Sequence, residues 1–270
     1  MTGQSPPKRE ARRRGFNLVP QRFEDGRHIA IGRGLARLGY EPTWALDRSI
    51  GAGDAIVTWN LTGRDGLVEI ARAAGAKLVV AEEAYTRRLA PGKRFALALW
   101  GHAGSGIWPD GGIERWERLG IELTPWRAVG ERIVVCGQRG IGSKAMASPP
   151  NWHEMTAKKL WGLTARPVVV RPHPGKRKNE IEPFLAQIAG AHAVVVWSSA
   201  CGVEALVHGV PVFYAAPFFV AAAAARRWPR DVEDCFLADR AHALGRVAWA
   251  EWDLGEIESG EALERVLACA

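Results

Sequence analysis

A pair of serines placed between an apolar run and an expected helix could bind a phosphate. Residues 194–196 are three valines, and Ser198 and Ser199 stand just before a segment expected to be helical over 202–208. A serine in that place is a natural N-cap, and the free N–H groups and dipole of a helix N-terminus attract a phosphate. Glu204 lies about one turn into the helix, within reach of ribose hydroxyls. A plain capped helix would have the same sequence, so other residues must decide.

A second polar pair, Arg171 and His173, stands at the end of the strand expected over 167–171. In an open parallel sheet, ligands bind beyond the carboxyl ends of the strands, so both side chains are expected beside the two serines. A guanidinium and an imidazole in that place can clamp a diphosphate or stabilise a departing phosphate. Their position favours a phosphate site over a plain capped helix.

A glycine-rich segment with a basic residue follows the strand expected over 132–136. The backbone of such a turn can approach a phosphate closely, while the guanidinium pairs with its charge. The residues predicted to bind the phosphate in this way are Gln138, Arg139, Gly140, Gly142 and Ser143. An ordinary loop is the alternative interpretation of this segment.

Two candidates for a general base lie in the first half of the chain. His102 stands in a Gly-rich loop after the strand expected over 94–99, and Glu82 follows the strand expected over 77–81. Either group could take the proton of an acceptor hydroxyl. Glu83 is the neighbour of Glu82, but two adjacent acids do not easily point into one cleft, and Glu83 suits a helix start. A loop histidine without a chemical role is the alternative for His102.

Short apolar runs alternate with amphipathic segments along the chain, which predicts strands joined by helices. This alternation implies βαβ units and parallel sheets, so the predicted fold class is α/β. Strands are expected at 16–19, 55–59, 77–81, 94–99, 132–136, 167–171, 193–197 and 211–214. Helices are expected at 26–39, 65–74, 113–119, 152–163, 181–188, 202–208 and 241–270.

The expected elements divide into two Rossmann-like parallel-sheet halves that face a cleft. A chain of 270 residues suits two domains of about 120 to 140 residues each. We expect a disordered basic leader at 1–14, an N-terminal domain at 15–130, a C-terminal domain at 131–250 and a C-terminal helix at 251–270.

The composition is that of an ordinary globular protein, with 47% hydrophobic and 24% charged residues. No apolar run reaches the roughly 20 residues of a membrane span, and no signal peptide is evident, so we expect a cytoplasmic protein. The four cysteines are dispersed without CxxC spacing, which argues against a zinc site and a disulfide framework. A net charge of +7 is compatible with nucleic acid or with phosphate-bearing substrates.

A strand ending in His-Pro at His173, a strand ending in Ser-Ser, and a helix glutamate before Gly-Val-Pro-Val at 209–212 resemble the donor half of GT-B glycosyltransferases. The similarity is to the capsule-polysaccharide (Kdo-type) and teichoic-acid polymerase branches, and it covers roughly a fifth of the chain. It implies that His173, Ser198 and Ser199 bind the phosphates of a nucleotide-sugar donor and that Glu204 meets the ribose. The layout also resembles uncharacterised bacteriophage proteins, and phages encode GT-B enzymes that glycosylate hydroxymethylated bases of DNA.

The resemblance implies a metal-independent glycosyltransferase that moves a sugar from a UDP- or CMP-linked donor to an acceptor hydroxyl, with no other cofactor. Modified DNA and a surface glycan are the acceptors considered, and a phage enzyme would act in the host cytoplasm. The departing phosphate would be stabilised by Arg139, Arg171, His173 and the helix end at Ser198. The alternatives are a nucleotide- or nucleic-acid-binding protein without catalysis and a nucleotide-sugar epimerase.

Overall fold

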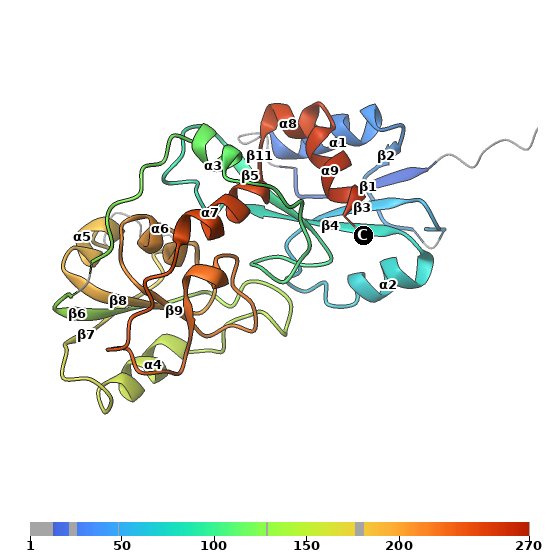
Figure 1. Cartoon of the computed structure of the whole chain (residues 1–270). Helices are drawn as coiled ribbons and strands as arrows, with labels where there is room; N and C mark the ends of the chain where they lie inside the picture. Colours follow the sequence, from blue (N-terminus) through green and yellow to red (C-terminus); the bar gives the residue numbers. More distant parts are fainter. Residues whose placement is uncertain (1–12, 22–25, 48, 128, 176–180, 270) are drawn as a thin grey trace, which may run out of the picture.

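The chain forms two β-sheets with helices packed against them (Figure 1). The computed structural model describes residues 13–21, 26–47, 49–127, 129–175 and 181–269. The expected basic leader falls mainly on residues 1–12, which lie outside the described residues. The strands are β1 (Arg14–Leu18), β2 (Glu41–Thr43), β3 (Ala55–Trp59), β4 (Lys77–Glu83), β5 (Arg94–Leu99), β6 (Arg132–Cys136), β7 (Val168–Arg171), β8 (Ala191–Val196), β9 (Val212–Tyr214), β10 (Arg226–Arg227) and β11 (Glu251–Asp253).

The helices connect most of these strands and cover both sheets. They are α1 (Arg27–Arg37), α2 (Leu67–Ala74), α3 (Glu114–Arg118), α4 (Trp152–Leu160), α5 (Phe184–Ile188), α6 (Ala200–Val207), the 3-10 helix η1 (Ala222–Ala224), α7 (Arg240–Trp249), α8 (Leu254–Glu258) and α9 (Glu261–Ala268). Among the described residues, no helix is long and apolar enough to cross a bilayer.

Within the described residues, the strand order is β11-β5-β4-β3-β1-β2 in one sheet and β10-β9-β8-β6-β7 in the other. The second sheet is parallel throughout. Its central strands β6 and β8 are buried on both faces, which explains their unbroken valine runs. Val134 and Val194 pack with α6 and α7, while Ile133 and Val195 pack on the opposite face against α4. The predicted α/β class with two Rossmann-like units is therefore confirmed.

The first sheet is mixed, where a parallel sheet was expected. β5 pairs antiparallel with β4, and β11 pairs antiparallel with β5. Residues 84–93 alone separate β4 from β5, and a parallel pair would need a crossover connection of a dozen or more residues. The reversed strand sends the loop after β5 out from the amino end of β4, where the N–H of Trp100 donates to the carbonyl of Leu78 at 2.9 Å.

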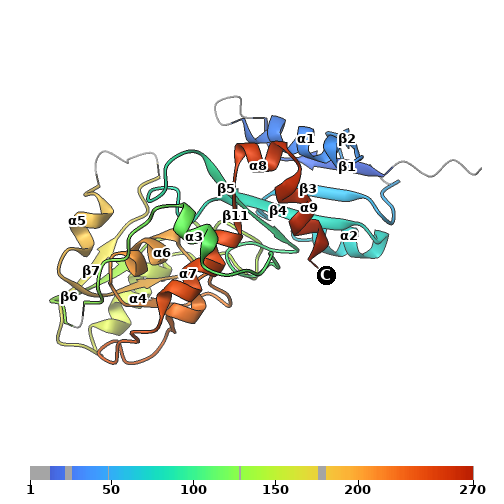
Figure 2. The same cartoon turned by 45° about the horizontal axis from the view of Figure 1, so that its top comes forward.

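The end of the chain returns to the first sheet, as Figures 1 and 2 show. α7 packs in the core of the second unit, where Leu244 contacts the same cluster as Leu206 of α6. β11 then joins the first sheet, and Ile257 and Leu263 of α8 and α9 pack on that sheet beside α1. The single helix expected over 251–270 is therefore a strand followed by two helices.

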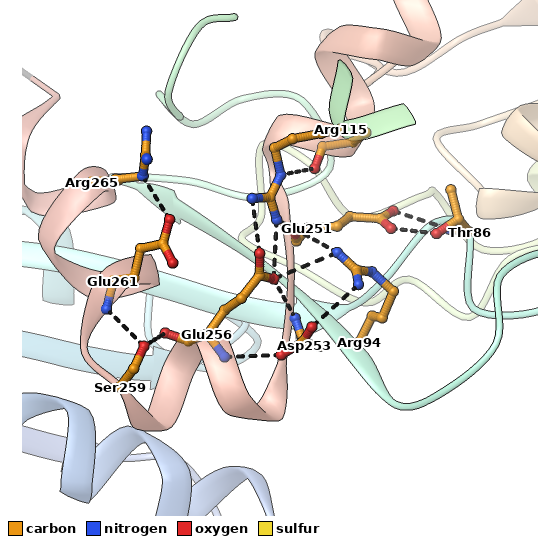
Figure 3. A network of polar contacts seen from close by, with 10 residues as sticks. Thr86, Arg94, Arg115, Glu251, Asp253, Glu256, Ser259, Glu261 and Arg265 are labelled. Carbon is orange, nitrogen blue, oxygen red and sulfur yellow. Dashed lines mark hydrogen bonds and ion pairs between the residues drawn. The ribbon is translucent and has the colours of Figure 1, made fainter. Parts of the chain in front are cut away.

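A buried carboxylate fastens this returning segment to the loop after β4 (Figure 3). Glu251 is fully buried, and its Oε1 accepts hydrogen bonds from the N–H groups of Tyr85 at 2.8 Å and Thr86 at 3.0 Å. Arg115 of α3 donates to the Glu251 carbonyl at 2.6 Å and pairs with Glu256 at 2.9 Å. These contacts hold residues 85 and 86, and therefore the two arginines that follow them.

Candidate functional site

A cavity of about 420 Å³ is lined by residues of both units. Most of the predicted site residues line it, namely Glu82, His102, Gln138, Arg139, His173, Ser198 and Ser199. A neighbouring cavity of about 930 Å³ shares Glu83, Arg87, Arg139 and His173 with the first. The two cavities therefore form one cleft, which we call the central cleft.

The Ser198–Ser199 turn is held in place by Gln138. The N–H of Ser198 donates to Oε1 of Gln138 at 3.0 Å, and Nε2 of Gln138 donates to Oγ of Ser198 at 3.1 Å. Ser199 is the N-cap of α6, and its Oγ accepts the N–H of Cys201 at 3.2 Å. Ser198, Ser199 and Ala200 all line the central cleft. The N-terminus of α6 therefore opens into it, where the helix dipole favours an anion.

His173 lies in a strongly positive environment. Partial burial, as the largest cause, and the nearby guanidinium groups together lower the pKa of His173 to about 4; the guanidinium groups act in the order Arg139, Arg87, Arg88 and Arg171. Nδ1 of His173 accepts the N–H of Gly175 at 3.0 Å. The ring is therefore neutral at pH 7 and carries its proton on Nε2. Burial is the main cause of the low pKa, and the four guanidinium groups that add to it make the cleft around His173 positively charged.

Arg87 and Arg88 were missed by the sequence reasoning, which considered only the two glutamates before them. Both arginines line the central cleft from the first unit, opposite the N-terminus of α6. The available signal was their position a few residues beyond the end of β4, at the edge where ligands bind in such sheets. Asn60, which follows β3 and lines the same cleft, was missed as well.

Two residues that were predicted to bind a phosphate or a ribose form bonds with other groups of the chain instead. Nη1 of Arg171 donates to the carbonyl of Glu182 and to Oε1 of Gln187, both at 2.7 Å, so this buried side chain fastens α5. Oε2 of Glu204 pairs with Nη1 of Arg88 at 2.9 Å and joins the two units. Both residues still line the larger cavity of the central cleft.

The glycine-rich segment does not offer its N–H groups in the way the sequence suggested. The N–H of Gly140 donates to Oγ of Ser148 at 3.1 Å, and the N–H of Gly142 donates to Oγ1 of Thr62 at 2.8 Å. The carbonyl of Ser143 accepts the N–H of Met146 in a turn. These bonds fix the loop and link it to the first unit, and Arg139 is its charged residue in the cleft, which Gln138 and Ile141 also line.

The two base candidates lie together despite the reversal of β5. The loop after β5 reaches back to Glu82, whose Oε1 accepts the N–H of Ala103 at 2.7 Å and the hydroxyl of Tyr85. His102 is 4% exposed, and its Nδ1 has no hydrogen-bond partner among the described residues. A side chain at Gly142 would place Cβ 2.6 Å from Nε2 of His102, so this close approach requires glycine.

Metal ligands are not gathered in the described part of the chain. No group of three or more His, Cys, Asp or Glu residues there is arranged to hold a metal ion.

Two Rossmann-like units that enclose a cationic cleft define a GT-B-like fold. No protein-family model and no curated protein sequence matches the chain. Two solved structures from Thermosulfurimonas dismutans KpsC are similar to it. The beta Kdo 2,7 transferase has a TM-score of 0.55 and 18% identity, over 88% of this chain and 89% of that chain. The beta Kdo 2,4 transferase has a TM-score of 0.53 and 15% identity, over 89% and 91%. At these identities, the similarity shows a shared fold over nearly the whole chain.

Proposed function

We propose that the protein is a glycosyltransferase that moves a sugar from a nucleotide-sugar donor to an acceptor hydroxyl. The observation that carries the proposal is the central cleft, where the N-terminus of α6 and a group of arginines line one cavity. The chain that forms this cleft has a fold similar to that of two Kdo transferases. A phosphate-bearing donor suits such a site because helix termini and guanidinium groups both stabilise phosphate oxygens.

The donor's phosphate would lie at Ser199, with Arg87 and Arg139 around it. Both arginines line the same cavity as the serine turn. As the bond between sugar and phosphate breaks, negative charge grows on the phosphate, and fixed cations stabilise that charge in the transition state. His173 would donate from Nε2 to the same phosphate. No metal ion or further cofactor is required by this proposal.

The acceptor hydroxyl would lose its proton to His102 or Glu82. Glu82 is oriented by the N–H of Ala103 and by Tyr85, and His102 is buried beside it in the cavity wall. A base in a fixed orientation near the reacting centre lowers the barrier through positioning as well as through proton transfer.

The donor carries UDP or CMP, and the acceptor is either a hydroxymethylated base of phage DNA or a surface glycan. The net charge of +7 supports a polyanionic acceptor. Binding to duplex DNA at increasing salt separates the two classes, because a DNA enzyme loses affinity steeply as salt rises. An enzyme of either class would work in the cytoplasm.

A thermal-shift screen against UDP, CMP, GDP and their sugars tests the proposal. A ligand that binds only the native state raises the melting temperature of the protein. At least one nucleotide should produce such a shift, and Ser199→Ala and His173→Ala should each reduce it. If no nucleotide or nucleotide sugar shifts the wild-type protein, the donor site is wrong.

A nucleotide-binding protein without catalysis is the second candidate. The observation in its favour is that the Glu82 carboxylate already accepts hydrogen bonds from Ala103 and Tyr85. Tight nucleotide binding without turnover of any nucleotide sugar would select this candidate. An epimerase would alter the nucleotide sugar without an acceptor, which analysis of the product sugar would reveal.

A further inference from the structure

Two of the four cysteines lie side by side beneath the central cleft. Cys136 ends β6 and is buried, while Cys201 is partly exposed in the first turn of α6. Both line a small cavity of about 40 Å³ at the base of the cleft. The two thiols are close enough for each to shift the pKa of the other. Dispersed positions in the sequence concealed this pair, because the fold brings the ends of β6 and β8 together.

The surroundings favour the thiolate form of Cys201. Nη1 of Arg88 lies 3.8 Å from the sulfur, and Oγ of Ser199 accepts the N–H of Cys201 at the helix N-terminus. The neighbouring thiol of Cys136, followed by Ser199 and Arg88, lowers the pKa of Cys201 to about 6, although burial opposes this effect. Glu204 is the nearby group whose charge disfavours the thiolate. A partly exposed thiolate next to a cation is the usual setting of a reactive cysteine.

We propose that Cys136 and Cys201 form a redox-modification site, at which a peroxide oxidises the two thiols to a disulfide. The Cys201 thiolate attacks one peroxide oxygen, the O–O bond breaks, and the departing hydroxide takes up a proton to become water. Cys201 is then a sulfenic acid. The sulfur of Cys136 attacks that of Cys201, the S–S bond forms, and hydroxide leaves with the Cys136 proton as a second water. Two thiols are oxidised and one peroxide is reduced.

Cys235 provides a control within the same chain. Burial, and to a lesser extent the charge of Glu233, raises its pKa to about 11. Its sulfur lies 3.3 Å from Nε2 of His192, away from the arginines of the cleft. At neutral pH, Cys201 should therefore react with iodoacetamide at least about tenfold faster than Cys235. Equal rates in the folded protein would overturn the assignment of Cys201 as the reactive thiol.

The disulfide itself is tested by peptide mapping of the full chain after treatment with hydrogen peroxide. Cys136 lies in the tryptic peptide 133–139, which should appear linked to the peptide that carries Cys201, at the summed mass less two hydrogen atoms. Dithiothreitol should separate the two peptides. Cys201→Ser should abolish the linked species, and Cys235→Ser should leave it unchanged.

Peroxide treatment that leaves both thiols free, or that oxidises Cys201 without linking it to Cys136, would overturn the proposal. The wild-type map decides this point even where a variant fails to fold. The readout is a covalent bond in the unliganded chain, so it does not depend on the proposed glycosyltransferase activity. Failure of the disulfide would leave the donor site untouched, and failure of nucleotide binding would leave the disulfide untouched.

Discussion

The ion pair between Arg88 and Glu204 joins the two units, and we expect its two partners to respond unequally to mutation. Nη1 of Arg88 lies 2.9 Å from Oε2 of Glu204, and the side chains are 40% and 7% exposed, respectively. Removing the arginine leaves a buried carboxylate without its counterion. Removing the carboxylate charge leaves an arginine that water can still reach. Arg88→Met should therefore destabilise the protein more than Glu204→Gln.

The magnitude follows from this partial burial. Removing one partner of a fully buried pair costs about 3 to 5 kcal/mol, and an exposed pair contributes at most about 1 kcal/mol. The pair lies between these limits, so Arg88→Met should cost about 2 kcal/mol of unfolding free energy. Glu204→Gln should cost about 1 kcal/mol, because the amide keeps the shape of the side chain and can still accept a hydrogen bond.

Urea unfolding of both single variants and the double variant measures the interaction. The double variant should cost about 1.5 kcal/mol, well below the sum of the single costs, since each substitution removes the same interaction. Arg33→Met is the matched control, because Arg33 and Glu258 form a pair at 2.6 Å with side chains 63% and 38% exposed. That control should cost under about 1 kcal/mol. Additive single costs, or a larger cost for Glu204→Gln than for Arg88→Met, would refute the reasoning.

Three further perturbations test other parts of the cleft. Gly142→Ala should lower the unfolding free energy by at least about 2 kcal/mol, because φ is +125° and the new methyl would lie 2.6 Å from Nε2 of His102. Gly120→Ala is the control, with φ +64° and nothing within 4 Å of the new methyl, and should lower it by about 1 kcal/mol. Equal losses in urea unfolding would contradict the close approach at Gly142. A bound phosphate should raise the pKa of His173 from about 4, so binding takes up a proton and the affinity for a nucleotide sugar should rise as pH falls from about 8 to about 5. His173→Gln should remove this pH dependence in calorimetric titrations, and an unchanged dependence would contradict it. Glu251→Gln should cost about 2 kcal/mol of stability because its buried carboxylate accepts two N–H groups of the loop after β4; a cost near zero would show that this contact does not hold the loop.

The strands and the helix cap of the second unit were largely predictable from sequence, because they depend on residues that are close together along the chain. The valine runs of β6 and β8 are buried on both faces and leave a strong pattern, and a serine directly before a helix is a cap wherever it occurs. The direction of β5 was not predictable from its apolar pattern, which is the same for both directions. The short connection before it was the usable signal, and it favours an antiparallel pair.

The site residues that sequence reasoning placed differently depend on long-range contacts. Gly140 and Gly142 were expected to donate to a phosphate, but the N–H of Gly142 donates to Thr62, 80 positions away, and that of Gly140 donates to Ser148 later in the same loop. Glu204 likewise pairs with an arginine 116 positions away, which it meets only in the folded chain. Such partners leave no periodic signal in sequence, because spacing along the chain says nothing of which loops meet across a cleft.

The central claim is that the cleft between the two sheets binds the phosphate of a nucleotide. Calorimetric titration with the nucleotide that gives the largest thermal shift tests it most directly. The account predicts one nucleotide per chain and a Kd at least about tenfold higher in Arg87→Ala and in Arg139→Ala, since a hydrogen bond to a charged group contributes about 1.5 to 3 kcal/mol. Arg33→Ala, remote from the cleft lining, should bind like the wild type. Unchanged affinity in both cleft variants would contradict the account.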